Sequence, residues 1–139
     1  MSECQTTAYG YNDNHQLIYT TFSCSAVQPN DDSFYSISIG DGAGGNMGNH
    51  ASGTQGTYAI ALGSCAGQSN QGESATAIGN DAGKTMQGEN AVALGANAGR
   101  DNQGVSAIAI GSAAGWSEQG KDAIALGTNA GEKAQGERA

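Results

Sequence analysis

Cysteine and histidine are the side chains in this sequence that most often carry redox, metal or nucleophilic chemistry. Cys4, Cys24 and Cys65 show no Cys-x-x-Cys spacing, so their pattern does not indicate a zinc or redox site. His15 and His50 fall in expected turns, without the pattern of nucleophile and carboxylate that a catalytic triad needs. The sequence therefore predicts no catalytic residue, and we expect a protein that is not an enzyme.

Acidic residues and glycine-rich runs do not change this expectation. Calcium-binding β-rolls repeat aspartate in one phase, whereas Asp81, Asp101 and Asp122 occupy three different phases of the repeat described below. The run 40–45 has the composition of a phosphate-binding loop, but the Lys-Ser or Lys-Thr pair and the helix of such a loop do not follow it. We expect no metal and no cofactor.

Composition and charge exclude further classes of function. The formal net charge is -8, and the only basic residues are Lys84, Arg100, Lys121, Lys133 and Arg138, which are spread out rather than clustered. Phosphate backbones bind clustered Lys and Arg, so no nucleic-acid partner is expected. No basic and apolar leader and no apolar run of membrane-helix length is present, which predicts neither secretion nor membrane insertion. The chain is expected to be assembled in a cytoplasm or to be a fragment of something longer.

A 16-residue repeat organises most of the chain. Five units without gaps begin at Ala59, Ala75, Ala91, Ala107 and Ala123. In every unit positions 1, 3 and 8 are Ala, positions 5, 9 and 14 are Gly, and position 13 is Gln. Positions 6, 7, 10 to 12, 15 and 16 vary and are expected to face solvent; Cys65 at position 7 is interpreted as a neutral surface substitution.

The repeat sets the domain boundaries. An imperfect copy begins at Ser36, and its Gln-Gly pair arrives seven residues late because of a glycine-rich insertion at 45–53. Terminal repeats of solenoids are often atypical in this way. The sequence therefore predicts an N-terminal module at 1–35 and a repeat shaft at 36–139, with an atypical first coil at 36–58 and five regular coils at 59–138.

Each unit alternates alanine at positions 1 and 3 with Ile, Val, Leu or, once, Thr at positions 2 and 4, the period of a strand with two different faces. One such coil is too small to be stable alone, so the coils must stack as parallel strands about 4.8 Å apart. We expect an all-β parallel solenoid whose position-5 glycines make turns, namely Gly63, Gly79, Gly95, Gly111 and Gly127. The aliphatic residues are expected to form the solenoid core or a seam between chains, and they are Ile37, Ile39, Ile60, Leu62, Ile78, Val92, Leu94, Ile108, Ile110, Ile124 and Leu126.

The invariant glutamines are predicted to form an amide ladder along the axis, in which each amide bonds to the next. The ladder residues are Gln71, Gln87, Gln103, Gln119 and Gln135. A thin coil stack leaves apolar surface uncovered, and identical chains can cover it by associating around an axis. The repeat alone allows a dimer or a trimer.

The run Ala-Ile-Ala-Leu-Gly-x-x-Ala-Gly, with Gln-Gly between copies, resembles the head repeats of trimeric autotransporter adhesins. The resemblance covers 36 to 139 and implies a left-handed parallel β-roll in a homotrimer. The unit is longer than the bacterial one, and the Asn-Ser pair that often opens the bacterial motif is missing from most copies. Repeats with this Gln-Gly spacing also look like those of phage and other viral structural proteins.

Residues 1–35 hold six of the eight aromatic residues. Folding this segment about Asn14 into a β-hairpin places Cys4 opposite Cys24. A Cys4–Cys24 disulfide fits that register, whereas free thiols are favoured in a reducing cytoplasm. The module is expected either to anchor the shaft to a larger particle, such as a capsid or tail, or to cap the first coil, and both remain open.

These features predict a trimeric structural protein of a virion, either a capsid-decorating (cement) spike or a short fibre, on the virion surface after assembly in the host cytoplasm. The alternative is the head fragment of a bacterial surface adhesin, on the cell surface. An ice-binding solenoid is a third, weaker alternative because the outward positions lack a regular threonine array. Trp116, at variable position 10, is a candidate contact for a host receptor or glycan, or an incidental exposed aromatic.

Overall fold

The computed structural model describes residues 4–11, 17–24, 36–45 and 55–139, and for the first two of these ranges it describes the backbone. These residues are nearly all β, with one short 3-10 turn, η1 (Ala43–Gly45). The strands are β1 (Cys4–Tyr11), β2 (Leu17–Cys24), β3 (Ile37–Ile39), β4 (Ile60–Leu62), β5 (Ser69–Gln71), β6 (Thr76–Ile78), β7 (Thr85–Gln87), β8 (Val92–Leu94), β9 (Asp101–Gln103), β10 (Ile108–Ile110), β11 (Ser117–Gln119), β12 (Ile124–Leu126) and β13 (Lys133–Gln135).

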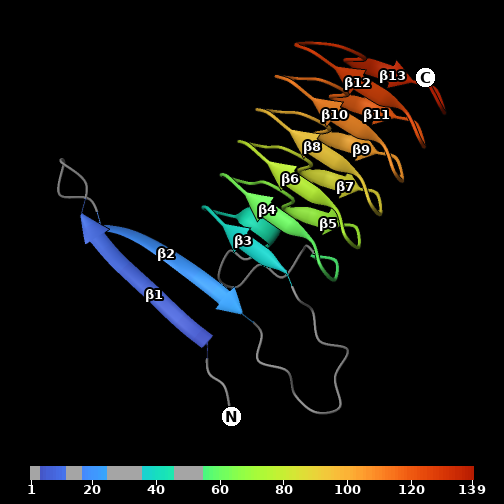
Figure 1. Cartoon of the computed structure of the whole chain (residues 1–139). Helices are drawn as coiled ribbons and strands as arrows, with labels where there is room; N and C mark the ends of the chain where they lie inside the picture. The colour runs from blue at the N-terminus through green and yellow to red at the C-terminus, as the bar shows by residue number, and fades with distance from the viewer. Residues whose placement is uncertain (1–3, 12–16, 25–35, 46–54) are drawn as a thin grey trace.

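The shaft is a parallel β-solenoid, as the repeat predicted (Figure 1). Each regular coil contributes one strand to each of two sheets, ordered β12-β10-β8-β6-β4-β3 and β13-β11-β9-β7-β5. Strands pair in the register of the repeat, so that Ile108 lies between Val92 and Ile124. Equivalent residues of successive coils therefore form straight columns along the shaft.

The buried interior is built almost entirely from alanine. The alanines at positions 1, 3 and 8 of the regular coils from Ala59 to Ala123 are fully buried, and Gln71, Gln87, Gln103 and Gln119 of position 13 lie among them with exposures of 2–3%. No Ile, Val or Leu belongs to the buried interior of the described residues. The interpretation of the aliphatic residues as solenoid core is therefore wrong, because the coil is so thin that alanine methyl groups already fill it.

Close packing fixes the glycines of positions 5, 9 and 14, and positions 5 and 9 show the two ways in which it does so. The position-5 glycines have φ near +130°, and a Cβ on Gly95 would lie 2.7 Å from the carbonyl oxygen of Gly111 in the next coil. At position 9, a Cβ on Gly83 would lie 2.7 Å from Oε1 of Gln87. The first glycine lets successive turns stack, and the second makes room for the glutamine side chain.

The variable positions 7, 12 and 16 accept many residue types but are constrained in backbone conformation. In every regular coil the residues there have positive φ, including Cys65 at 55°, Ala113 at 54° and Glu118 at 56°. This left-handed region costs most side chains about 1–2 kcal/mol and is tolerated best by Gly, Asn and Asp. Cys65 is thus a strained substitution in a turn, where neighbouring coils carry Asp81 and Asn97.

The first coil carries the insertion where the repeat placed it. Ile37 of β3 pairs with Ile60 of β4, whereas Gln55 already pairs with Gln71. The additional residues therefore lie between β3 and Gln55, and the predicted loop 45–53 itself lies almost wholly outside the described residues.

Strands β1 and β2 pair antiparallel, with Cys4 opposite Cys24. Strand β2 also contacts β3, the first strand of the shaft. The side chains of both strands, and hence the predicted Cys4–Cys24 disulfide, lie outside the described residues, as do His15 and His50.

Candidate functional site

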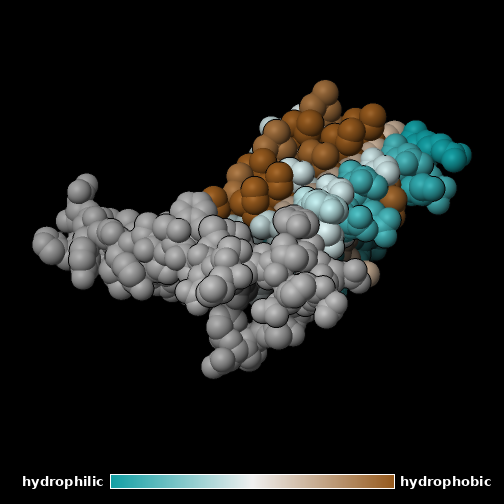
Figure 2. Space-filling view, turned by 60° about the horizontal axis from the view of Figure 1, so that its bottom comes forward, coloured by the Kyte–Doolittle hydropathy of each residue, from teal (hydrophilic) through white to brown (hydrophobic). Residues whose placement is uncertain are grey.

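The largest chemical feature of the shaft is an apolar stripe on the outer face of the sheet that runs from β3 to β12. Strand alternation turns position 3 inward and positions 2 and 4 outward. The outward residues are Ile37, Ile39, Ile60, Leu62, Thr76, Ile78, Val92, Leu94, Ile108, Ile110, Ile124 and Leu126. Figure 2 shows hydrophobic residues gathered on one side of the solenoid.

None of these side chains is fully covered. Ile37 is 51% exposed, Leu94 41% and Leu126 70%, and the others are half-buried or exposed. Soluble monomers rarely expose a contiguous apolar patch that runs the length of the molecule, and such patches mark binding surfaces. The stripe is the feature of this structure that most needs a partner.

One row of the stripe differs from the rest. Thr76 takes the outward place at position 2 of its coil, between Ile60 and Val92 of the neighbouring coils. Its backbone carbonyl accepts a bond from Gln87, and its side chain is half-buried at the surface of the stripe. The hydroxyl is the one polar side-chain group among the stripe residues.

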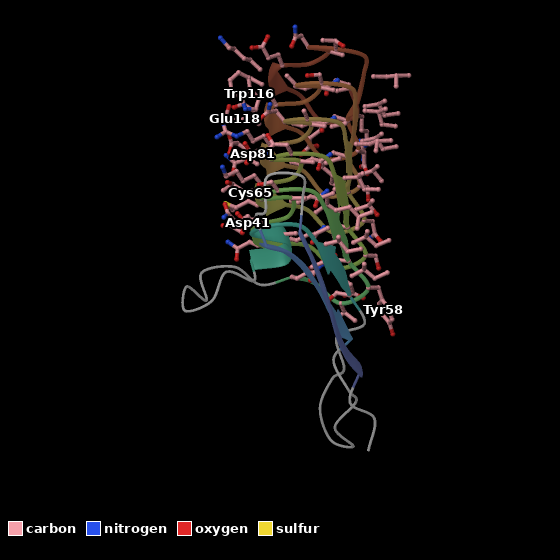
Figure 3. All side chains as sticks on the ribbon, turned by 90° about the vertical axis from the view of Figure 1, so that its left-hand side faces the viewer. Asp41, Tyr58, Cys65, Asp81, Trp116 and Glu118 are labelled. Atoms are coloured by element: carbon pink, nitrogen blue, oxygen red, sulfur yellow. The ribbon has the colours of Figure 1, made fainter. Side chains whose placement is uncertain are left out.

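The outer face of the other sheet is polar and irregular. Its middle strand residues are exposed and follow no regular pattern: Asn70, Met86, Asn102, Glu118 and Ala134. Figure 3 shows Glu118 and Trp116 on the side of the shaft opposite Tyr58. The irregularity gives no repeated array that could match a lattice such as ice.

The glutamine side chains tie the two sheets together rather than mainly one another. Nε2 of Gln103, on β9, donates to the carbonyl oxygen of Val92 on β8 at 2.7 Å and to that of Ala107 at 3.2 Å. Amide-to-amide bonds are longer, at 3.3 Å from Gln103 to Gln119 and 3.2 Å from Gln119 to Gln135. The amide nitrogen therefore forms its shorter hydrogen bonds with backbone carbonyl oxygens and its longer one with the next glutamine.

The predicted amide ladder is therefore only partly formed. The Oε1 atoms of Gln71, Gln87 and Gln103 are buried without a hydrogen-bond partner. Each of these glutamines still donates to a carbonyl on the opposite strand at 2.7–2.8 Å. The glutamines are structural cross-braces of the coil, which makes them poor candidates for ligand binding.

Trp116 is half-buried rather than an isolated exposed aromatic. Arg100 occupies the same repeat position in the preceding coil, and its guanidinium carbon lies 5.8 Å from the centre of the Trp116 ring. The ring nitrogen Nε1 of Trp116 is buried and has no partner. The stacked arginine covers part of the surface that a glycan or receptor would need.

The described part of the chain holds little else that could do chemistry. It contains no group of three or more His, Cys, Asp or Glu residues placed to hold a metal ion. None of its helical segments could cross a membrane. Its ion pairs are surface contacts, such as Lys84 to Asp81 at 2.9 Å and Arg100 to Asp101 at 3.7 Å.

The aliphatic residues chosen from the sequence lie together, although outside the core, and the chosen glutamines lie together inside it. Sequence reasoning missed the role of Thr76 in the stripe and the left-handed turns at positions 7, 12 and 16. The recurrence of Asn and Asp at those turn positions was the signal that could have found them.

Comparisons of the chain with protein-family models, with curated proteins and with solved structures found no match. The geometry of the shaft is accordingly the basis on which a function can be argued.

Proposed function

We propose that this chain is a non-enzymatic structural protein whose shaft self-associates through the apolar stripe into a parallel homotrimer on the surface of a virion. The observation that carries the proposal is the run of half-buried and exposed aliphatic side chains along one sheet, which only Thr76 interrupts. The interior of the coil is complete without them, so packing within one chain does not explain their presence.

A second copy of this chain is the partner that best fits the stripe. The aliphatic rows repeat with the spacing of the coils, about 4.8 Å. A partner that is to cover every row must repeat at the same spacing, and an identical solenoid does so by construction. The stripe carries no charge although the chain has a formal net charge of -8, so copies can meet there without burying like charges.

Three-fold symmetry and a left-handed coil come from the resemblance to trimeric adhesin heads and viral repeat proteins. Three copies around one axis would each turn the β3–β12 sheet inward and the polar β5–β13 sheet toward solvent. Such an arrangement would bury the stripe completely, whereas a two-fold pair of flat sheets is the competing solution.

A capsid-decorating spike or a short fibre is the role that suits a rod of stacked coils with an uncharged interior. The head of a bacterial surface adhesin is the alternative. Neighbouring genes separate them: capsid and tail genes support the first, and a downstream membrane-anchor domain supports the second. The third alternative, an ice-binding solenoid, would give thermal hysteresis, and we expect the purified protein to show none.

The N-terminal module is proposed to attach the trimer to the particle, with capping of the first coil as its rival. The contact of β2 with β3 supports the cap. Deleting residues 1–35 separates the two, because an anchor is required for attachment but not for assembly of the shaft. A truncated protein that still decorates particles would remove the anchoring role.

The proposal is tested by measuring the mass of the full chain by sedimentation over a wide range of concentrations. The expected result is a single species with the mass of three chains. A stable monomer at micromolar concentration would reject self-association, and a stable dimer would reject the three-fold arrangement.

A further inference from the structure

The apolar stripe contains a single polar row, and that row can decide how the chains line up. Thr76 sits at position 2 of its coil, and position 2 is Ile60 in the coil before it and Val92 in the coil after it. Both neighbours are aliphatic and offer the hydroxyl no hydrogen-bond partner. We propose that Thr76 is the residue that specifies a parallel, in-register, three-fold assembly of this chain, an inference that rests on the self-association proposed above.

The argument starts from what a buried hydroxyl needs. A hydroxyl taken out of water without a hydrogen-bond partner is destabilising, whereas a paired one is tolerated. Any assembly that covers the stripe removes Thr76 from water. The favoured assembly is therefore the one that brings a polar partner to the Thr76 row.

Parallel and antiparallel pairings differ sharply on this point. The sheet has six rows, in the order β3, β4, β6, β8, β10 and β12, and β6 is the third of them. With full overlap, an antiparallel partner sets its fourth row, that of Val92 and Leu94, against Thr76. A parallel partner in register sets Thr76 against Thr76, so only this arrangement pairs hydroxyl with hydroxyl.

The count of donors and acceptors then favours three chains over two. A hydroxyl has one hydrogen to donate and two lone pairs to accept. Around a three-fold axis each Thr76 hydroxyl can donate to the next and accept from the previous one, so all three donors are used. In a two-fold pair one hydroxyl donates and the other has no acceptor. A shift by one coil replaces threonine with Ile60 or Val92 as the partner and loses every bond.

Thr76 thus has the part that a single buried polar residue has in a coiled coil, where it fixes register at a cost in stability. Replacing it with valine, which has the same shape, is expected to strengthen association and weaken its uniqueness. The valine row would match any other row of the stripe, and shifted or antiparallel pairings would then become competitive.

The test measures register directly. In full-length protein with the three native cysteines replaced by serine, one nitroxide label is placed at Ala96→Cys, and in a second sample at Thr128→Cys. Both residues are exposed at position 6, two residues beyond the stripe. Distances between copies are measured by pulsed electron resonance, with the oligomer mass checked for each sample.

The unsubstituted stripe is expected to give one short distance, the same at both labels. With Thr76→Val, the Thr128 label is expected to gain a second population, displaced by up to about 24 Å, since an antiparallel partner places that label five coils away. Thr76→Ser, which keeps the hydroxyl, should restore the single distance. Thr85→Val on the other sheet is the matched control and should leave it unchanged.

The outcomes separate this inference from the proposed function. If Thr76→Val stays trimeric with the single short distance at both labels, Thr76 does not set the register, while self-association stands. If the parent protein is a monomer and shows no distance between copies, the proposed function itself fails.

Discussion

The two sheets of the shaft share one interior and differ completely on their outer faces. The strands of the β3–β12 sheet turn alanine inward, those of the β5–β13 sheet turn glutamine inward, and the strands of both sheets pair in parallel. Outside, the β3–β12 sheet presents Ile, Leu and Val in nearly every row, whereas the β5–β13 sheet presents Ser, Thr, Asp and Lys at its first strand position. Strands of the second sheet pair in register without aliphatic residues on their outer face, so strand pairing by itself does not require the stripe.

The largest expected effect comes from placing a lysine on the outer face of one sheet and comparing it with a lysine on the other sheet. Ile108→Lys on β10 is expected to weaken self-association on the order of 100-fold or more, since a buried unpaired charge costs an interface about 3 kcal/mol or more. Ser117→Lys on β11 is the matched control, because Lys133 already fills the equivalent place on β13. Sedimentation of both variants measures the effect, and equal masses for the two would show that the sheets do not differ in function.

The cross-brace that both sheets share is tested by Gln103→Leu. The substitution removes the donor to Val92 and Ala107 and leaves both carbonyls buried without that bond. Unfolding stability is expected to fall by about 2–3 kcal/mol. Urea unfolding at fixed chain concentration measures it, with the half-buried Gln68→Leu as control. Equal losses in the two variants would mean that the amide bonds contribute nothing specific.

The strained turns between the sheets provide a smaller effect of opposite sign. Ala113→Asn places a residue suited to φ of 54° where Asn97 and Asn129 already occupy the neighbouring coils. Stability is expected to rise by about 0.5–1 kcal/mol. Ala96→Asn, at a position without positive φ, should change it by less than about 0.5 kcal/mol. Thermal unfolding of both variants compares them, and a rise only in Ala96→Asn would contradict the account.

The smallest effect concerns the polar side alone. A double-mutant cycle of Arg100→Gln and Trp116→Leu is expected to give a coupling energy of about 0.5–1 kcal/mol for the stacked pair. On a glycan array, wild type and Trp116→Ala are expected to bind alike, because Arg100 covers part of the ring. Selective loss of a glycan in the variant would return Trp116 to the list of contact residues.

Much of the fold could be predicted from the sequence because the repeat is exact. Invariant Ala, Gly and Gln at 16-residue spacing predicted stacked coils, strand positions and even the place of the insertion before Gln55. The inward and outward sides of the strand could not be told apart by the same means, since alternation of Ala with Ile is compatible with either face inward. The narrow coil decides it, as only alanine fits.

The positive φ of the variable positions could not be predicted from the sequence for a related reason. Glu118 and Met86 have side chains of ordinary surface residues, and their positive φ is imposed by the coil path rather than chosen by the residue. Gln103 likewise bonds to a backbone carbonyl because of the distance across the coil. The spacing of the glutamines in the sequence does not reveal that distance.

The most direct test of the central claim is an experimentally determined structure of the assembled protein. The account predicts three parallel chains whose β3–β12 sheets face a common axis, with the Thr76 residues at one level and the β5–β13 sheets toward solvent. A structure in which the chains meet through the polar sheet, or in which Ile108 and its row neighbours remain open to solvent, would contradict it.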